Sequence, residues 1–136
     1  MKISSTKAGK LHFIRLNKDD DILLTLRKVV EEKKIKTGFI MNGLGSVQSY
    51  HYHVVADCNI PPAESFPKAE EPCDVIAVTG MVIDGRVHAH IILSDSEKAQ
   101  GGHLEEGTRV LTFTVIVIME AEELSFTDWD GVGIEM

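Results

Sequence analysis

The chain has 136 residues, of which 43% are hydrophobic and 26% charged. This length and composition favour a single soluble domain over residues 1–136 with a hydrophobic core of its own. The net charge of −7 at pH 7 opposes unassisted binding to DNA, which ordinarily requires a basic surface.

The sequence predicts neither a secretory signal nor a membrane-spanning helix. Met1–Lys7 lacks the apolar stretch of a secretory signal, and no apolar run approaches the roughly 20 residues of a membrane-spanning helix. We therefore expect a cytoplasmic protein with no membrane partner. Cys58 and Cys73 could pair, but two reduced thiols are favoured in that compartment.

A strand over Leu11–Leu16 and a long helix are predicted in the first quarter of the chain. Asp19–Asp21 precede apolar residues that recur at the spacing of one helical face. These residues are Ile22, Leu23, Leu26, Val29 and Val30. Gly38 is a natural end for this helix, because glycine tolerates the backbone of a helix terminus.

Two strands are predicted next, Phe39–Met41 and Val47–Ala56, with a glycine turn over Asn42–Ser46 between them. Residues 57–72 hold all four prolines and are expected to form a long loop or a brief irregular crossing.

Asp84-Gly85 indicates a two-residue hairpin between strands over Val75–Ile83 and Arg86–Leu93. That turn fixes the register, so that Met81 faces His88 and Thr79 faces His90. A polar loop over Ser94–Gly107 should follow.

The final strand, Arg109–Glu120, has apolar residues on both faces, which a helix or another subunit must cover. The layout predicts an α+β fold, a mainly antiparallel sheet with one long helix and short helical segments.

Three histidines form the most informative pattern. His88 and His90 stand two apart on a predicted strand, so their imidazoles share one face of the sheet. His103 follows Gly101-Gly102 and could complete a three-nitrogen site. We predict that His88, His90 and His103 bind a divalent metal, with zinc the first candidate; the alternative is a hydrogen-bonded or proton-responsive histidine cluster.

Other polar residues are weaker candidates. Asp95, Glu105 and Glu106 could orient the ligands or could be solvated loop charges. His51 and His53 repeat the two-residue spacing, but no third ligand accompanies them. An exposed or intersubunit strand is the favoured explanation of that pair, with a fourth ligand from either histidine as the alternative.

The pattern Gly-x-x-His-x-His at residues 85–90, followed by Gly-Gly-His-Leu-x-x-Gly at residues 101–107, resembles the plant and prokaryote conserved (PPC) domain. The resemblance extends over roughly Leu11–Leu124. It implies a compact α+β homotrimer whose prokaryotic members hold a metal, commonly zinc, at positions matching His88, His90 and His103. Plant relatives join this domain to AT-hooks, and prokaryotic members are often labelled candidate DNA-binding proteins, but this chain has no Arg-Gly-Arg-Pro hook.

Two functions follow as hypotheses. The first is a homotrimeric, metal-binding assembly module whose partner is itself. The second is a small zinc-dependent hydrolase or lyase, in which an open coordination position lowers the pKa of bound water to ~7 and Glu105 is a weak candidate base. Association with DNA, implied by the family, is disfavoured by the charge.

Overall fold

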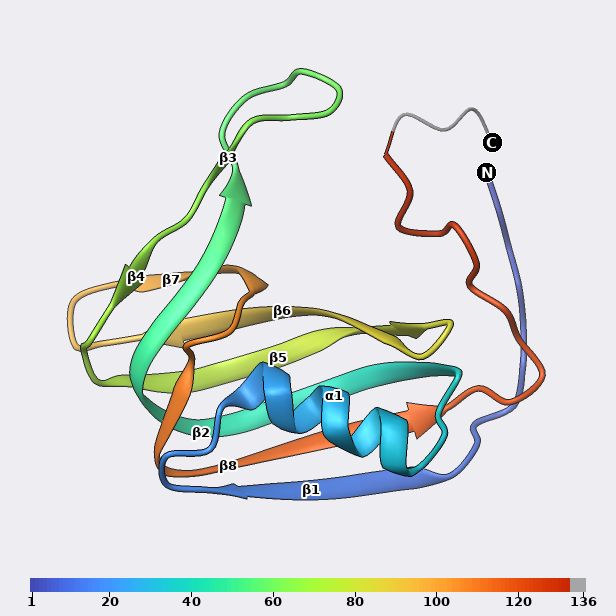
Figure 1. Cartoon of the computed structure of the whole chain (residues 1–136), viewed down its shortest axis with the longest axis horizontal. Coiled ribbons are helices and arrows are strands. Elements are labelled where there is room, and N and C mark those ends of the chain that lie inside the picture. Colours follow the sequence, from blue (N-terminus) through green and yellow to red (C-terminus); the bar gives the residue numbers. More distant parts are fainter. Residues whose placement is uncertain (133–136) are drawn as a thin grey trace.

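The computed structural model describes residues 1–132, which form one helix and eight strands (Figure 1). The elements are β1 (Leu11–Asn17), α1 (Ile22–Glu32), β2 (Thr37–Val55), β3 (Glu64–Ser65), β4 (Lys68–Ala69), β5 (Cys73–Ile83), β6 (Arg86–Ser94), β7 (Ala99–Leu104) and β8 (Arg109–Glu120). The main sheet has the order β1-β8-β2-β5-β6-β7, and its strand pairs are antiparallel. A mainly antiparallel sheet with a helix is therefore confirmed.

The helix begins where it was predicted but is shorter. The Asp21 carboxylate caps α1 by accepting a hydrogen bond from the Leu24 N–H at 3.0 Å. The helix ends at Glu32 after 11 residues, and Lys34 turns the chain with a φ of 54°. The prediction of a long helix ending at Gly38 is wrong, and so is that of short helical segments within residues 1–132.

Helix α1 lies against one face of the sheet and leaves the other face open (Figure 1). On the covered face, Leu26 of the helix shares one buried cluster with Ile40 and Ile118 of the strands. The opposite face, called here the outer face, carries exposed apolar side chains. These are Leu11, Phe13, Phe39, Leu44, Ile92 and Phe113.

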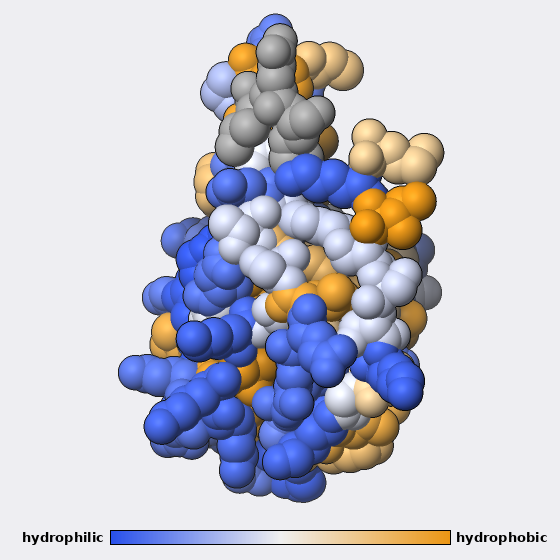
Figure 2. All heavy atoms as spheres, turned by 90° about the vertical axis from the view of Figure 1, so that its right-hand side faces the viewer, coloured by the Kyte–Doolittle hydropathy of each residue, from blue (hydrophilic) through white to orange (hydrophobic). Residues whose placement is uncertain are grey.

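The side view agrees with this division of the sheet. In Figure 2, hydrophobic residues line the lower right edge of the molecule, the side away from α1. Hydrophilic residues crowd the lower left edge, where the helix lies.

Strand β2 is a single strand of 19 residues, whereas two strands were predicted. The glycine segment Asn42–Ser46 lies inside it and is marked by irregular register with β8, not by a turn. A side chain at Gly45, with a φ of 151°, would meet the backbone of Phe113 and Thr114. The first part of β2 lies between β8 and β5, and its far end pairs with β3, β4 and β7.

The β5–β6 hairpin is confirmed in its predicted register, with Met81 opposite His88 and Thr79 opposite His90. The predicted loop over Ser94–Gly107 is wrong in part, because it contains strand β7. That strand lies between β6 and the far end of β2.

No helix within residues 1–132 has the length and apolar character needed to cross a membrane. The two cysteines are free, Cys58 exposed and Cys73 buried, as the sequence favoured. Burial raises the pKa of the Cys73 thiol, which keeps it protonated and unreactive.

Candidate metal centre

Strand pairing carries four histidines to one place on the outer face. The hairpin sets His88 and His90 on β6. His103 on β7 stands opposite His90 on one side and opposite His53 of β2 on the other. The three predicted ligands are thus brought together, and a fourth imidazole joins them.

The ring of His103 lies close to each of the other three. The ring centre of His103 lies 4.2 Å from that of His53, 4.7 Å from that of His88 and 5.4 Å from that of His90. The rings of His88 and His90 are nearly parallel, with centres 5.5 Å apart.

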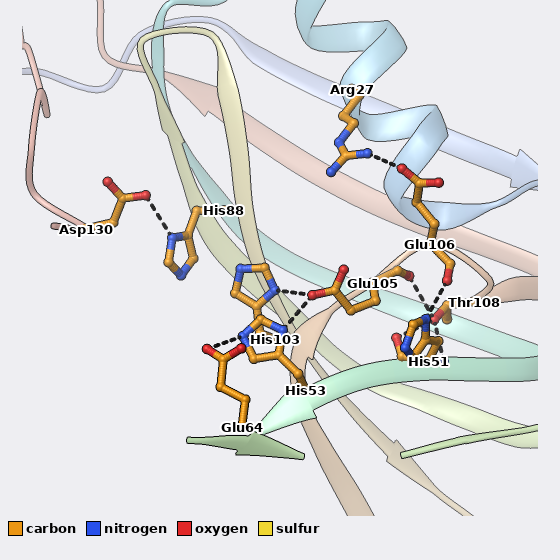
Figure 3. Close-up of polar contacts among 10 residues, drawn as sticks. All are labelled: Arg27, His51, His53, Glu64, His88, His103, Glu105, Glu106, Thr108 and Asp130. Carbon is orange, nitrogen blue, oxygen red and sulfur yellow. Dashed lines mark hydrogen bonds and ion pairs between the residues drawn. The ribbon is translucent and has the colours of Figure 1, made fainter. Parts of the chain in front are cut away.

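Glu105 completes the cluster, as the close-up in Figure 3 shows. Its Oε1 lies 2.5 Å from Nδ1 of His53 and 3.5 Å from Nδ1 of His103. The other ring nitrogen of His53, Nε2, lies 3.5 Å from the Glu64 carboxylate on β3. We call His53, His88, His90, His103 and Glu105 the histidine cluster.

The two glycines before His103 allow β7 to fit between its neighbours. A side chain at Gly101 would meet the carbonyl oxygen of Ile91, and one at Gly102 would meet that of His53. The diglycine therefore serves close strand packing and not the flexible loop that the sequence suggested.

One buried polar atom of the cluster lacks a hydrogen-bond partner. Nδ1 of His103 is buried and makes no hydrogen bond, since its 3.5 Å contact with Glu105 is at the limit of that interaction. A buried nitrogen without a partner costs about 1–3 kcal/mol, and a metal ion would satisfy it. Ligand atoms of His53, His103 and Glu105 all lie within 4.8 Å of one another. Imidazole nitrogen with carboxylate oxygen is a donor set suited to zinc.

The electrostatics favour uncharged imidazoles at His103 and His90. Burial lowers the pKa of His103, and His53 and His88 lower it further, while Glu105 acts in the opposite direction. The pKa of His90 is also lowered, chiefly by loss of water around the ring, although the residue remains exposed on the sheet face. Neutral imidazole is the form that binds a metal.

A second carboxylate holds His88 from outside the cluster. Asp130 lies 3.1 Å from Nδ1 of His88 and accepts two hydrogen bonds from Arg86. These bonds hold the pKa of Asp130 below its usual value, so the group is an anion at neutral pH.

The other polar residues that the sequence offered as candidates lie outside the histidine cluster. Glu106 pairs with Arg27 of α1, and Asp95 caps the turn at Glu97 and Lys98, so neither contacts a histidine of the cluster. His51 lies apart from the cluster, and its Nδ1 is 2.8 Å from the Glu106 carbonyl oxygen (Figure 3).

Sequence reasoning undervalued His53 and did not find Asp130. The shared spacing of His51 and His53 was the available signal, and it could not show which of them β2 would bring to β7. That His88, His90 and His103 are the metal ligands stays a prediction.

Known proteins share this fold. The metal-containing protein from Archaeoglobus fulgidus has a TM-score of 0.76 at 24% identity, covering 90% of this chain and 88% of that chain. A plant- and prokaryote-conserved (PPC) protein from Pyrococcus horikoshii has a TM-score of 0.74 at 21% identity, covering 92% and 87%. A candidate DNA-binding protein from Bacteroides thetaiotaomicron has a TM-score of 0.69 at 23% identity, covering 90% and 85%. At these identities the likeness shows the fold.

One curated relative also matches. The bifunctional protein GlmU of a Synechococcus strain is 23% identical over 119 residues, which are 87% of this chain and 18% of that protein. The chain thus spans about a fifth of the relative. The family model of the Plants and Prokaryotes Conserved (PCC) domain matches residues 3–122, which include the helix and every strand of the described structure. The chain therefore belongs to the Plants and Prokaryotes Conserved domain family, named PPC above.

Proposed function

We propose that this protein is a metal-binding assembly module that binds one divalent ion, zinc foremost, at the histidine cluster and associates with copies of itself as a homotrimer. The observation that carries the metal proposal is that ligand atoms of His53, His103 and Glu105 lie within 4.8 Å of one another, with the rings of His88 and His90 beside that of His103. The unsatisfied Nδ1 of His103 and the lowered pKa of that residue support it. The metal-containing relative from Archaeoglobus fulgidus supports it as well.

The outer face supports self-assembly. Leu11, Met119, Phe39, Met81 and His88 follow one another across five strands in register. The exposed apolar residues of β1 and β2 therefore share a face with the histidine cluster. An apolar face of this extent is a typical protein interface, and copies of the same chain would cover it.

The two alternative functions, a zinc-dependent enzyme and a DNA-binding protein, have less support. Glu105 Oε1 lies 2.5 Å from Nδ1 of His53 and 3.5 Å from Nδ1 of His103, which supports a role in holding the metal site over that of a free base beside a metal-bound water. The net charge of the chain, −7 at pH 7, opposes binding to DNA phosphates. The proposal therefore includes neither hydrolysis nor DNA.

The metal proposal is tested by zinc titration of the purified protein after chelator treatment. Wild type should bind about one equivalent, and His103→Ala should weaken binding by more than about 100-fold, because a ligand contributes more than an outer-shell partner. The fold should persist, since His103 lies on the outer face.

His51→Ala is the matched control, because His51 is a β2 histidine outside the cluster. It should bind zinc as wild type does. Equal zinc affinity in wild type and His103→Ala would show that the cluster is not the metal site.

A further inference from the structure

We propose that Asp130 is a positioning residue that holds the His88 imidazole in the tautomer and orientation that present its Nε2 to the histidine cluster. Residues 121–132, called here the C-terminal segment, carry this carboxylate to the strand. The consequence for metal binding rests on the proposed function, whereas the state of the His88 ring does not.

The C-terminal segment is fixed on the molecule at several points. Thr37 at the start of β2 donates a hydrogen bond from its hydroxyl to the Leu124 carbonyl oxygen at 2.7 Å. Thr127 donates to Asp84 in the hairpin turn at 3.0 Å. The rings of Phe126 and Trp129 pack with their centres 4.9 Å apart. Asp130 therefore reaches His88 from an anchored segment.

The carboxylate is held on two sides. Its Oδ2 lies 3.1 Å from Nδ1 of His88. The two terminal nitrogens of Arg86 donate to its Oδ2 and Oδ1 at 3.3 and 3.2 Å. Arg86 stands two residues before His88 on β6, so both side chains project from the same face of the strand. The Asp130 side chain is 18% exposed, which limits competition from water.

Hydrogen-bond chemistry then sets the tautomer of His88. An ionised carboxylate only accepts, so Nδ1 must carry a proton; in the neutral form of an imidazole with its proton there, Nε2 keeps its lone pair. Figure 3 shows Asp130 on one side of the His88 ring and His103 on the other. The free nitrogen thus belongs to the edge of the ring turned away from Asp130. Histidines that bind metals usually donate their other ring N–H to such an acceptor.

The first test is independent of metal. Proton–nitrogen NMR of the metal-free protein reports which nitrogen of His88 is protonated. Wild type should show the Nδ1–H tautomer, and Asp130→Ala should convert His88 to a mixture or to the other tautomer. Asp130→Asn, which keeps an acceptor oxygen, should restore the wild-type signal in part.

Asp128→Asn is the matched control, because it removes the same charge from the same segment at an exposed residue. It should leave the His88 signal unchanged. An unchanged Nδ1–H tautomer in Asp130→Ala would overturn the proposal whatever the protein does with zinc.

The second test measures zinc affinity in the same variants. Asp130→Ala should bind zinc about 10–100-fold more weakly than wild type, and Asp128→Asn should equal wild type. If Asp130→Ala changes the His88 tautomer but leaves the zinc affinity unchanged, His88 does not bind the metal in the way proposed. If His103→Ala also binds zinc normally, the proposed function fails, while the effect of Asp130 on the His88 tautomer stands on its own.

Discussion

At the scale of single residues, His103 is the centre of the site. Its ring contacts three other imidazoles, and its Nδ1 lies near the Glu105 carboxylate. Protonation of a partly buried ring among other histidines is unfavourable because water is scarce and like charges repel. Burial, the largest cause, thus lowers the pKa of His103.

This lowered pKa predicts a pH dependence of stability. As the pH falls through the ordinary histidine value of 6.5, the unfolded chain takes up a proton at His103 before the folded chain does. The unfolding free energy of the metal-free protein should therefore decrease below that pH and be unaffected by this group above it. Urea denaturation between about pH 8 and about pH 5.5 measures the effect. His103→Asn should reduce the decrease; an identical pH profile in that variant would contradict the prediction.

The diglycine gives a second prediction at this scale. A methyl group at Gly102 would meet the His53 carbonyl oxygen and the side chains of Val54 and Tyr52. Gly102→Ala should push β7 away from β2, destabilise the fold by about 1–3 kcal/mol and weaken zinc binding, because His53 and His103 separate. Denaturation and zinc titration check both effects. Wild-type values in both would show that the strands tolerate the side chain.

At the scale of elements, local signals predicted the β5–β6 hairpin and the start of α1, but not the end of that helix, strand β7 or the pairing of strands distant along the chain. Asp84-Gly85 fixed the hairpin, so the positions of His88 and His90 on β6 could be derived from the sequence. The approach of His53 to His103 depends on β2 bending across the sheet to reach β7. No residue near His53 encodes that contact, since it depends on strands distant along the chain.

Helix α1 was predicted from its apolar spacing, and its packing can be tested by a pair of leucines. Leu26 is completely buried against the sheet, whereas Leu24 is 48% exposed. Leu26→Ala should lower the unfolding free energy by about 2–5 kcal/mol, because it leaves a cavity in the core. Leu24→Ala should change it by less than about 1 kcal/mol. Equal losses in urea denaturation would mean that the helix does not pack on the sheet through this face.

At the scale of the whole molecule, one sheet face is covered by α1 and the other is open. The sequence indicated this division, because apolar residues on both faces of β8 required a second cover. It could not show that the histidine cluster shares the outer face with Leu11 and Phe39, since that follows from the register across five strands.

Self-assembly through the outer face is tested by adding a charge there. Phe13 is 73% exposed and lies on β1 at that face. Phe13→Asp should convert the expected trimer to a monomer, because an interface core does not accept an unpaired carboxylate. Light scattering after size-exclusion chromatography measures the mass.

Leu24→Asp is the matched control, since Leu24 is an exposed leucine on α1 away from the outer face. It should keep the wild-type mass. A monomeric wild type, or an unchanged mass in Phe13→Asp, would rule out assembly through this surface.

The most direct test of the central claim is anomalous diffraction at the zinc absorption edge from crystals of the zinc-loaded protein. A metal held by the histidine cluster predicts an anomalous peak at about 2.0–2.1 Å from a ring nitrogen of His103, with further ligands from His53, His88, His90 or Glu105. Zinc bound to the protein with its anomalous peak away from these side chains would contradict the claim.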